Sequence, residues 1–138
     1  MSAGESTGGV IVPQLQRTTD GIAAAAVILS GMVRRGEPLS EWVGRWPRFW
    51  MRRAKLPLPE GFSVERVYQT VAELYPGAAV ERIDGLKLLL DERAWVSVRP
   101  SGTEPVVRVF AEADDPARAD ELVRRTAQAV RRVLDSTV

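Results

Sequence analysis

The sequence contains no cysteine and no histidine among its 138 residues. This double absence excludes a disulfide framework, a thiolate zinc site, a cysteine nucleophile and any imidazole base or metal ligand. A chain without cysteine fits a reducing compartment. Lysine is also scarce, since Lys55 and Lys87 are the only two among 19 basic residues and all the others are arginine.

Long hydrophobic runs are missing as well. The longest candidate, 22–29, is far shorter than the roughly 20 apolar residues that a membrane-spanning helix needs. The segment before it lacks the positively charged start of a signal peptide. We therefore expect a soluble, cytoplasmic protein that has no membrane as a partner.

The composition is otherwise that of an ordinary globular protein, with 45% hydrophobic and 27% charged residues. Nineteen basic residues stand against 18 acidic ones, and the formal net charge is +1. So balanced a charge argues against a broad basic surface for nucleic acid. The length allows one compact domain, or a small domain with part of another.

The first part of the chain predicts a brief strand at 10–12 and then a helix. Asp20 is a candidate N-cap for a helix over 21–33, and Gly36 follows its last turn. Residues 22–29 leave this helix with no polar face, and such a helix needs burial on several sides. The preceding residues are too few to bury it, which indicates that the chain is a piece of something larger.

A change of pattern follows. Ser40 is expected to cap a short helix, and residues 45–56 mix aromatic and basic side chains in a way that predicts an extended strand or a linker. Proline and glycine cluster over 57–61, which predicts a boundary nearby. We therefore divide the chain into 1–45 and 46–138.

The second part has regular periodicity. Ser63 should cap a helix that Pro76 ends. Strands at 79–83 and 86–90 flank Asp84-Gly85, which predicts a two-residue hairpin turn with positive φ at both residues. Further strands are expected at 95–99 and 106–113, and Asp115 should cap a last helix that begins with Pro116. The order predicts an α+β fold, a four-stranded antiparallel sheet with two helices on one face.

The connection between the last two strands, 99–105, carries the strongest chemical signal. Arg99 offers a planar fork for two phosphate oxygens, and Ser101 and Thr103 add hydroxyl donors. Gly102 allows close approach of the backbone, and Arg108 can bring a second cation from the neighbouring strand. Residues of this kind also make ordinary solvated turns, so the composition alone leaves both interpretations open.

Two motifs resemble one enzyme family. The run R-P-S-G-T-E-P at 99–105 looks like the phosphate-binding loop in the last domain of the α-D-phosphohexomutases, which include phosphoglucomutase/phosphomannomutase and phosphoglucosamine mutase. The run G-E-S-T-G-G at 4–9 resembles the sugar-binding loop in the third domain of that family. The resemblance implies a TBP-like fourth domain, preceded by the C-terminal part of an α/β third domain.

The resemblance also implies roles for individual residues. Glu5 and Thr7 would hydrogen-bond sugar hydroxyls, and Arg99, Ser101, Gly102 and Thr103 would hold the phosphate that is not transferred. Gly9, where a histidine can follow the sugar-binding glycine, mildly favours phosphoglucomutase/phosphomannomutase over phosphoglucosamine mutase. The identity of the sugar phosphate stays open.

The catalytic motifs of the family are absent from the sequence. The phosphoserine loop needs a histidine, and the metal loop needs three alternating aspartates, whereas Asp114-Asp115 is better explained as a helix cap. We therefore expect no catalytic residue and no metal ligand here. The chain would be the C-terminal fragment of a mutase, inactive alone, whose parent interconverts hexose 1- and 6-phosphates through a bisphosphate with Mg²⁺ bound elsewhere. Its partners would be a hexose phosphate or phosphate and the missing N-terminal domains.

Two alternatives remain. The first is a stand-alone, non-catalytic module that binds phosphosugars or anions. The second is single-stranded nucleic-acid binding through the aromatic and basic residues of 45–56, which have suitable side chains for stacking and charge. We favour a strand with an inward aromatic face over the second alternative, because the overall charge is balanced.

Overall fold

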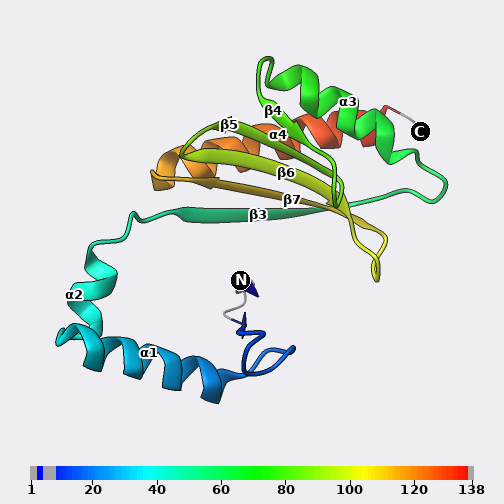
Figure 1. Cartoon of the computed structure of the whole chain (residues 1–138). Coiled ribbons are helices and arrows are strands. Elements are labelled where there is room, and N and C mark those ends of the chain that lie inside the picture. Colours follow the sequence, from blue (N-terminus) through cyan, green and yellow to red (C-terminus); the bar gives the residue numbers. More distant parts are fainter. Residues whose placement is uncertain (1–2, 5–8, 137–138) are drawn as a thin grey trace. The chain divides into compact units, whose positions relative to one another are not determined.

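A computed structural model describes residues 3–4 and 9–136 of the chain (Figure 1). The chain divides into two compact units, Met1–Trp46 and Pro47–Val138. Within the described ranges, no helix combines the length and the apolar character that crossing a bilayer would require.

The first unit contains a two-stranded antiparallel sheet and two helices. Its elements are β1 (Ala3–Gly4), β2 (Val10–Ile11), α1 (Gly21–Arg35) and α2 (Leu39–Gly44). The residues expected for the sugar-binding loop, Glu5 and Thr7, lie outside the described residues.

Helix α1 begins at the predicted cap. The Asp20 carboxylate accepts hydrogen bonds from the backbone N–H groups of Ile22 and Ala23, both at 2.9 Å. The helix ends at Gly36, whose φ of +65° suits glycine. The expectation for Ser40 is wrong, because α2 starts one residue earlier and Pro38 is its N-cap. Proline presets the extended backbone there but has no side-chain acceptor, and this helix start has no side-chain cap hydrogen bond.

Helix α1 has no buried residue although it is largely apolar. Ile22 is 86% exposed and Val33 is 82% exposed. A close contact with α2 occurs at Gly31, where an added Cβ would lie 2.6 Å from the Trp42 ring. The described residues of the first unit therefore leave the apolar surface of α1 uncovered, as its sequence led us to expect of a piece of something larger.

The second unit is an α+β fold built on one antiparallel sheet. The strands are β3 (Trp50–Pro57), β4 (Ala79–Glu81), β5 (Leu86–Asp91), β6 (Ala94–Pro100) and β7 (Val106–Ala113), and the helices are α3 (Val64–Leu74) and α4 (Pro116–Asp135). The strand order is β3-β7-β6-β5-β4. The predicted class and antiparallel sheet are confirmed, but the number of four strands is wrong. Most of the segment 45–56, which we left as strand or linker, lies in β3, and β3 pairs with β7 along its whole length.

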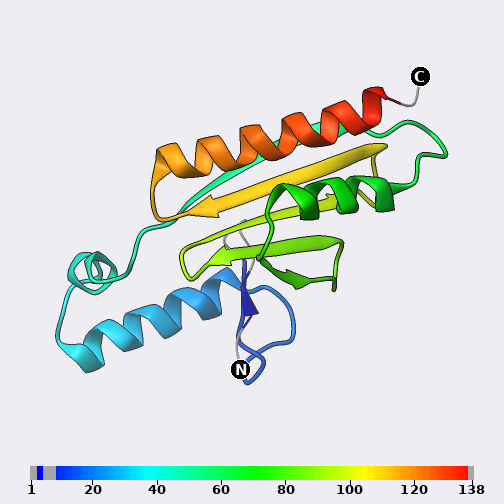
Figure 2. The same cartoon turned by 90° about the horizontal axis from the view of Figure 1, so that it is seen from above.

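Both helices cover the same face of this sheet, as predicted (Figure 1, Figure 2). Strand β7 alternates strictly, and Val107, Val109 and Ala111 are fully buried towards the helices. Helix α4 packs on β3 and β7, and α3 packs against α4. The opposite face carries no helix of this unit, and we call it the open face.

A hydrogen-bonded pair links the two helices inside the core. The Tyr75 hydroxyl lies 2.8 Å from the Thr126 hydroxyl, which itself donates to the Leu122 carbonyl at 2.8 Å. Thr126 is fully buried, so its polar group is satisfied where water is excluded. Burial raises the pKa of the Tyr75 phenol, which stays neutral in this pair.

The β4–β5 hairpin forms, but its turn differs from the predicted one. Glu81 pairs with Lys87, so the connection is longer than two residues. Gly85 has a φ of +96°, whereas no described residue other than glycine has a positive φ, Asp84 included. The register is set by burial of Leu86, which leaves Ile83 in the turn 96% exposed.

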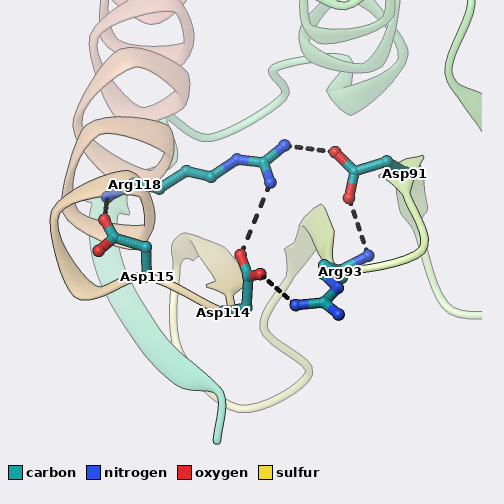
Figure 3. A network of polar contacts seen from close by, with 5 residues as sticks. All are labelled: Asp91, Arg93, Asp114, Asp115 and Arg118. Atoms are coloured by element: carbon teal, nitrogen blue, oxygen red, sulfur yellow. Dashed lines mark hydrogen bonds and ion pairs between the residues drawn. The ribbon is translucent and has the colours of Figure 1, made fainter. Parts of the chain in front are cut away.

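Where β6 begins and β7 ends, a polar network joins the β5–β6 turn to the start of α4 (Figure 3). Arg118 pairs with Asp91, and Arg93 donates to Asp114 at 3.0 Å. Asp115 accepts from the backbone N–H of Arg118 at 2.8 Å, so it is the helix cap that the sequence predicted. The hydrogen bond from Arg118 lowers the pKa of Asp91, with a smaller contribution from the backbone N–H of Arg93.

Candidate functional site

The loop between β6 and β7 is braced at both of its ends. The Ser101 N–H donates to the Val106 carbonyl at 2.9 Å, and the Val106 N–H donates to the Glu104 carbonyl at 2.8 Å. Directly after the neighbouring edge strand β3 ends, the Leu58 N–H donates to the Pro105 carbonyl at 2.8 Å. These bonds fix the loop against two strands, so its donors are held in place before any ligand binds.

The tip of the loop is open to solvent. Gly102 and Thr103 are exposed, and Ser101 is half-buried with its hydroxyl oxygen 3.4 Å from the Thr103 N–H. An added Cβ at Gly102 would meet no atom within 4 Å, and its φ is not positive. The fold itself therefore does not require glycine at 102, whereas a ligand close to the backbone would.

Residues of the β4–β5 hairpin turn hold Arg99 in place. Its guanidinium pairs with the Asp84 carboxylate and lies 5.7 Å from the centre of the Phe110 ring. The turn also touches the backbone of this strand, because a Cβ on Gly85 would lie 2.6 Å from the Val98 carbonyl oxygen and 2.8 Å from the Arg99 Cβ. Gly85 thus lets the hairpin pack directly behind Arg99.

Arg108 occupies the centre of a row of cations. In the register of the sheet it lies opposite Arg99 on β6 and opposite Lys55 on β3. Its Nη2 is 3.8 Å from Glu104, and its buried Nε has no hydrogen-bond partner among the described residues. Three like charges directly opposite one another repel, so the bare row is unfavourable unless anions neutralise it.

Two carboxylates flank this row. Asp84 pairs with Arg99, and Glu104 pairs with Lys55 at 2.9 Å. The Lys55 ammonium holds the pKa of Glu104 below its usual value, with a smaller contribution from Arg108. Cations and hydroxyl groups at one end of this sheet face make a site that suits an oxyanion.

A depression on the open face adjoins the row. Its lining residues come from β3 and β7: Arg53, Ala54, Lys55, Arg108 and Phe110. Within the described part of the chain, no three carboxylate or other metal-binding side chains gather so as to hold a metal ion. The two carboxylates of this site, Asp84 and Glu104, are each paired with a cation, so they do not make a metal-binding set.

The structure brings the predicted phosphate-binding residues to one place. Arg99, Ser101, Gly102 and Thr103 lie on one strand end and its loop, and Arg108 is directly across the sheet from Arg99. The sequence analysis missed Lys55 as a neighbour of this site. Its pairing with residue 104, which is 49 positions away, depends on the β3–β7 register and leaves no local signal.

Two family models match the chain. The model of the phosphoglucomutase/phosphomannomutase C-terminal domain matches residues 54–129, and that of the phosphoglucomutase/phosphomannomutase alpha/beta/alpha domain III matches residues 1–49.

Curated proteins of archaea are similar over nearly all of the chain. A phosphoglucosamine/phosphogalactosamine mutase of Sulfurisphaera tokodaii is 33% identical over 128 residues, which cover 91% of this chain and 28% of that protein. A probable phosphoglucosamine mutase of Methanopyrus kandleri is 35% identical over 135 residues, which cover 96% of this chain and 29% of that protein. The chain thus spans less than a third of the length of the curated relatives it matches.

Solved structures show the same fold. A phosphoglucomutase/phosphomannomutase family protein of Burkholderia thailandensis matches with a TM-score of 0.67 and 25% identity, over 94% of this chain and 28% of that one. An Aspergillus fumigatus N-acetylphosphoglucosamine mutase, solved with GlcNAc-6P and magnesium, matches with a TM-score of 0.56 and 21% identity, over 86% of this chain and 22% of that one. At that identity the second likeness concerns the fold alone.

Proposed function

We propose that this chain, which belongs to the phosphoglucomutase/phosphomannomutase family of phosphohexomutases, is the substrate-binding part of such an enzyme. Its sequence matches domain III and the C-terminal domain of that family. In this proposal Arg99, Ser101, Gly102, Thr103 and Arg108 bind the phosphate of a sugar phosphate that is not being transferred. The observation that carries the proposal is the row of cations beside a braced loop whose glycine the fold does not require.

The residues of the site suit binding rather than bond breaking. A guanidinium and hydroxyl groups stabilise a phosphate dianion, but none of them is a nucleophile activated by a neighbouring base. We place the nucleophilic serine and the Mg²⁺ ligands of the isomerase in N-terminal domains of the same enzyme, since the relatives are more than three times as long as this chain. Glu5 and Thr7 would contact the sugar hydroxyls. The chain alone would then have no mutase activity.

The exposed apolar surface of α1 supports this proposal over the stand-alone binding module. Ile22 and Val33 are more than four-fifths exposed, and an independent domain would bury such side chains in its own core. In the proposed enzyme, the remainder of the third domain covers α1.

The relatives also guide the choice of sugar. Both archaeal relatives are named for phosphoglucosamine, in contrast to the mild preference drawn from Gly9. We therefore propose a hexose or hexosamine phosphate, with glucosamine 6-phosphate as the first ligand to test and glucose 6-phosphate as the second.

Calorimetric titration of the full chain with glucosamine 6-phosphate tests the proposal. Arg99→Gln removes charge-assisted hydrogen bonds at a position whose side chain is 38% exposed, so we expect a loss of about 1.5–2 kcal/mol, or binding about ten- to thirtyfold weaker. Arg93→Gln is the matched control, because Arg93 is an exposed, carboxylate-paired arginine at the other end of β6. Equal binding by the wild type and Arg99→Gln would contradict the proposal.

A further inference from the structure

Glu104 is an acidic residue within a loop that is built to hold an anion. Its carboxylate stands beside the cation row, where an unrestrained negative charge would repel a phosphate and compete with it for arginine. How the fold deals with this carboxylate therefore bears directly on the site.

One oxygen of Glu104 faces two cations at unequal distances. Its Oε2 is 2.9 Å from Lys55 Nζ but 3.8 Å from Arg108 Nη2, which is outside hydrogen-bond range. Lys55 thus holds the carboxylate, and Arg108 is left with the weaker contact. The Arg108 side chain is 30% exposed and keeps donors towards the open face.

The geometry of the sheet keeps Lys55 away from a ligand centred on the loop and Arg99. Lys55 and Arg99 belong to strands on opposite sides of β7, so two strand spacings, about 10 Å, separate their backbones. A single phosphate on Arg99 and the loop would meet Arg108 first. Lys55 instead contacts Glu104, near the end of the loop. The Leu58 N–H anchors the same end by its 2.8 Å hydrogen bond to the Pro105 carbonyl.

We propose that Lys55 is a positioning residue of the phosphate site. From β3, Lys55 holds the Glu104 carboxylate and so leaves Arg108 available to the anion. This inference rests on the proposed function. Without Lys55, the nearest cation for Glu104 is Arg108, and the loop would then close its own site by an internal ion pair.

The chain offers a matched control for this idea. Lys87 is the other lysine of the sequence, lies on the same open face over Trp95, and also stands near a glutamate, with its Nζ 3.8 Å from Glu81. It is outside the row formed by Lys55, Arg108 and Arg99. Lys87→Met therefore removes one positive charge from the face without releasing Glu104.

The test is titration of the full chain with inorganic phosphate at low ionic strength, followed by amide resonances of the loop. We expect Lys55→Met to bind phosphate about three- to fivefold more weakly, since the pair it breaks is exposed, and Lys87→Met to stay within about twofold of the wild type. Adding Glu104→Gln to Lys55→Met should restore binding to within about twofold of the wild type, because the competing charge is then gone. Lys55→Arg should bind like the wild type.

The outcomes separate the inference from the proposed function. Unchanged phosphate binding by Lys55→Met would overturn the role of Lys55, whatever Arg99→Gln does. Weaker binding that Glu104→Gln does not restore would also overturn it, because Lys55 would then touch the anion itself. No phosphate binding by the folded wild-type chain would overturn the proposed function and this inference together.

Discussion

The pairing of Asp84 with Arg99 makes a prediction whose sign is not obvious. Asp84→Asn removes the carboxylate that competes with phosphate for Arg99, which favours binding. It also removes a contact that orients the guanidinium, which disfavours binding. The structure favours the first effect, because the Arg99 guanidinium keeps another restraint, the Phe110 ring whose centre lies 5.7 Å away.

The size of the effect follows from exposure. The Asp84 side chain is 73% exposed and that of Arg99 is 38% exposed, so their pair is worth no more than about 1 kcal/mol. We therefore expect Asp84→Asn to bind inorganic phosphate about two- to fivefold more tightly than the wild type at low ionic strength. The difference should shrink at high salt, which screens exposed charges.

The assay is phosphate titration of the loop amides, with thermal unfolding to verify the fold. Asp120→Asn is the control, because Asp120 makes an exposed pair with Arg52, 2.5 Å from its Nε, on the helix-covered side of the sheet. It should not change phosphate affinity. Weaker binding by Asp84→Asn would refute the reasoning, since it would mean that the carboxylate orients Arg99 more than it competes.

Three further predictions concern the fold that supports the site. Gly85→Ala should destabilise the second unit by about 2 kcal/mol or more in chemical unfolding. Its added Cβ would lie 2.6 Å from the Val98 carbonyl oxygen, and its φ of +96° is strained for alanine. Thr126→Val should lower the free energy of unfolding by about 1 kcal/mol, because it deletes the buried hydrogen bond to Tyr75. The pKa of Asp91 is lowered from 3.8, so its pair with Arg118 stabilises the fold above pH 3.8 and this stabilisation is lost as the pH falls through the lowered pKa. The destabilisation caused by Arg118→Met should therefore shrink below pH 3.8 in acid unfolding curves.

The helices of the second unit were predictable because their signals are local. Asp115 and Pro116 mark the start of α4 within two adjacent residues, and the buried positions of α3 recur at helical spacing. Strand β3 was less clear, because Arg52 lies among its inward-facing residues and is compensated by Asp120, 68 positions later. A pairing over that separation leaves no trace in the local pattern of apolar and polar residues.

The same distinction holds for the candidate site. The loop and Arg99 are contiguous and carry a recognisable composition, so the sequence pointed to them. Their supports come from elsewhere in the chain: Asp84 and Gly85 from a turn whose register is set by buried leucines, and Lys55 from the edge strand. Local propensity favoured a tighter turn at Asp84-Gly85, and burial of the strand side chains overrode it.

The most direct test of the central claim is to localise the bound sugar phosphate on the full chain. Amide resonances of Ser101, Gly102 and Thr103 should shift progressively and saturably as glucosamine 6-phosphate is added, together with the side-chain Nε–Hε resonance of Arg99. The Arg93 resonance, at the opposite end of β6, should stay in place. A folded chain in which the loop resonances remain unmoved, or in which Arg93 and the loop shift alike, would contradict the assignment of a phosphate site to this loop.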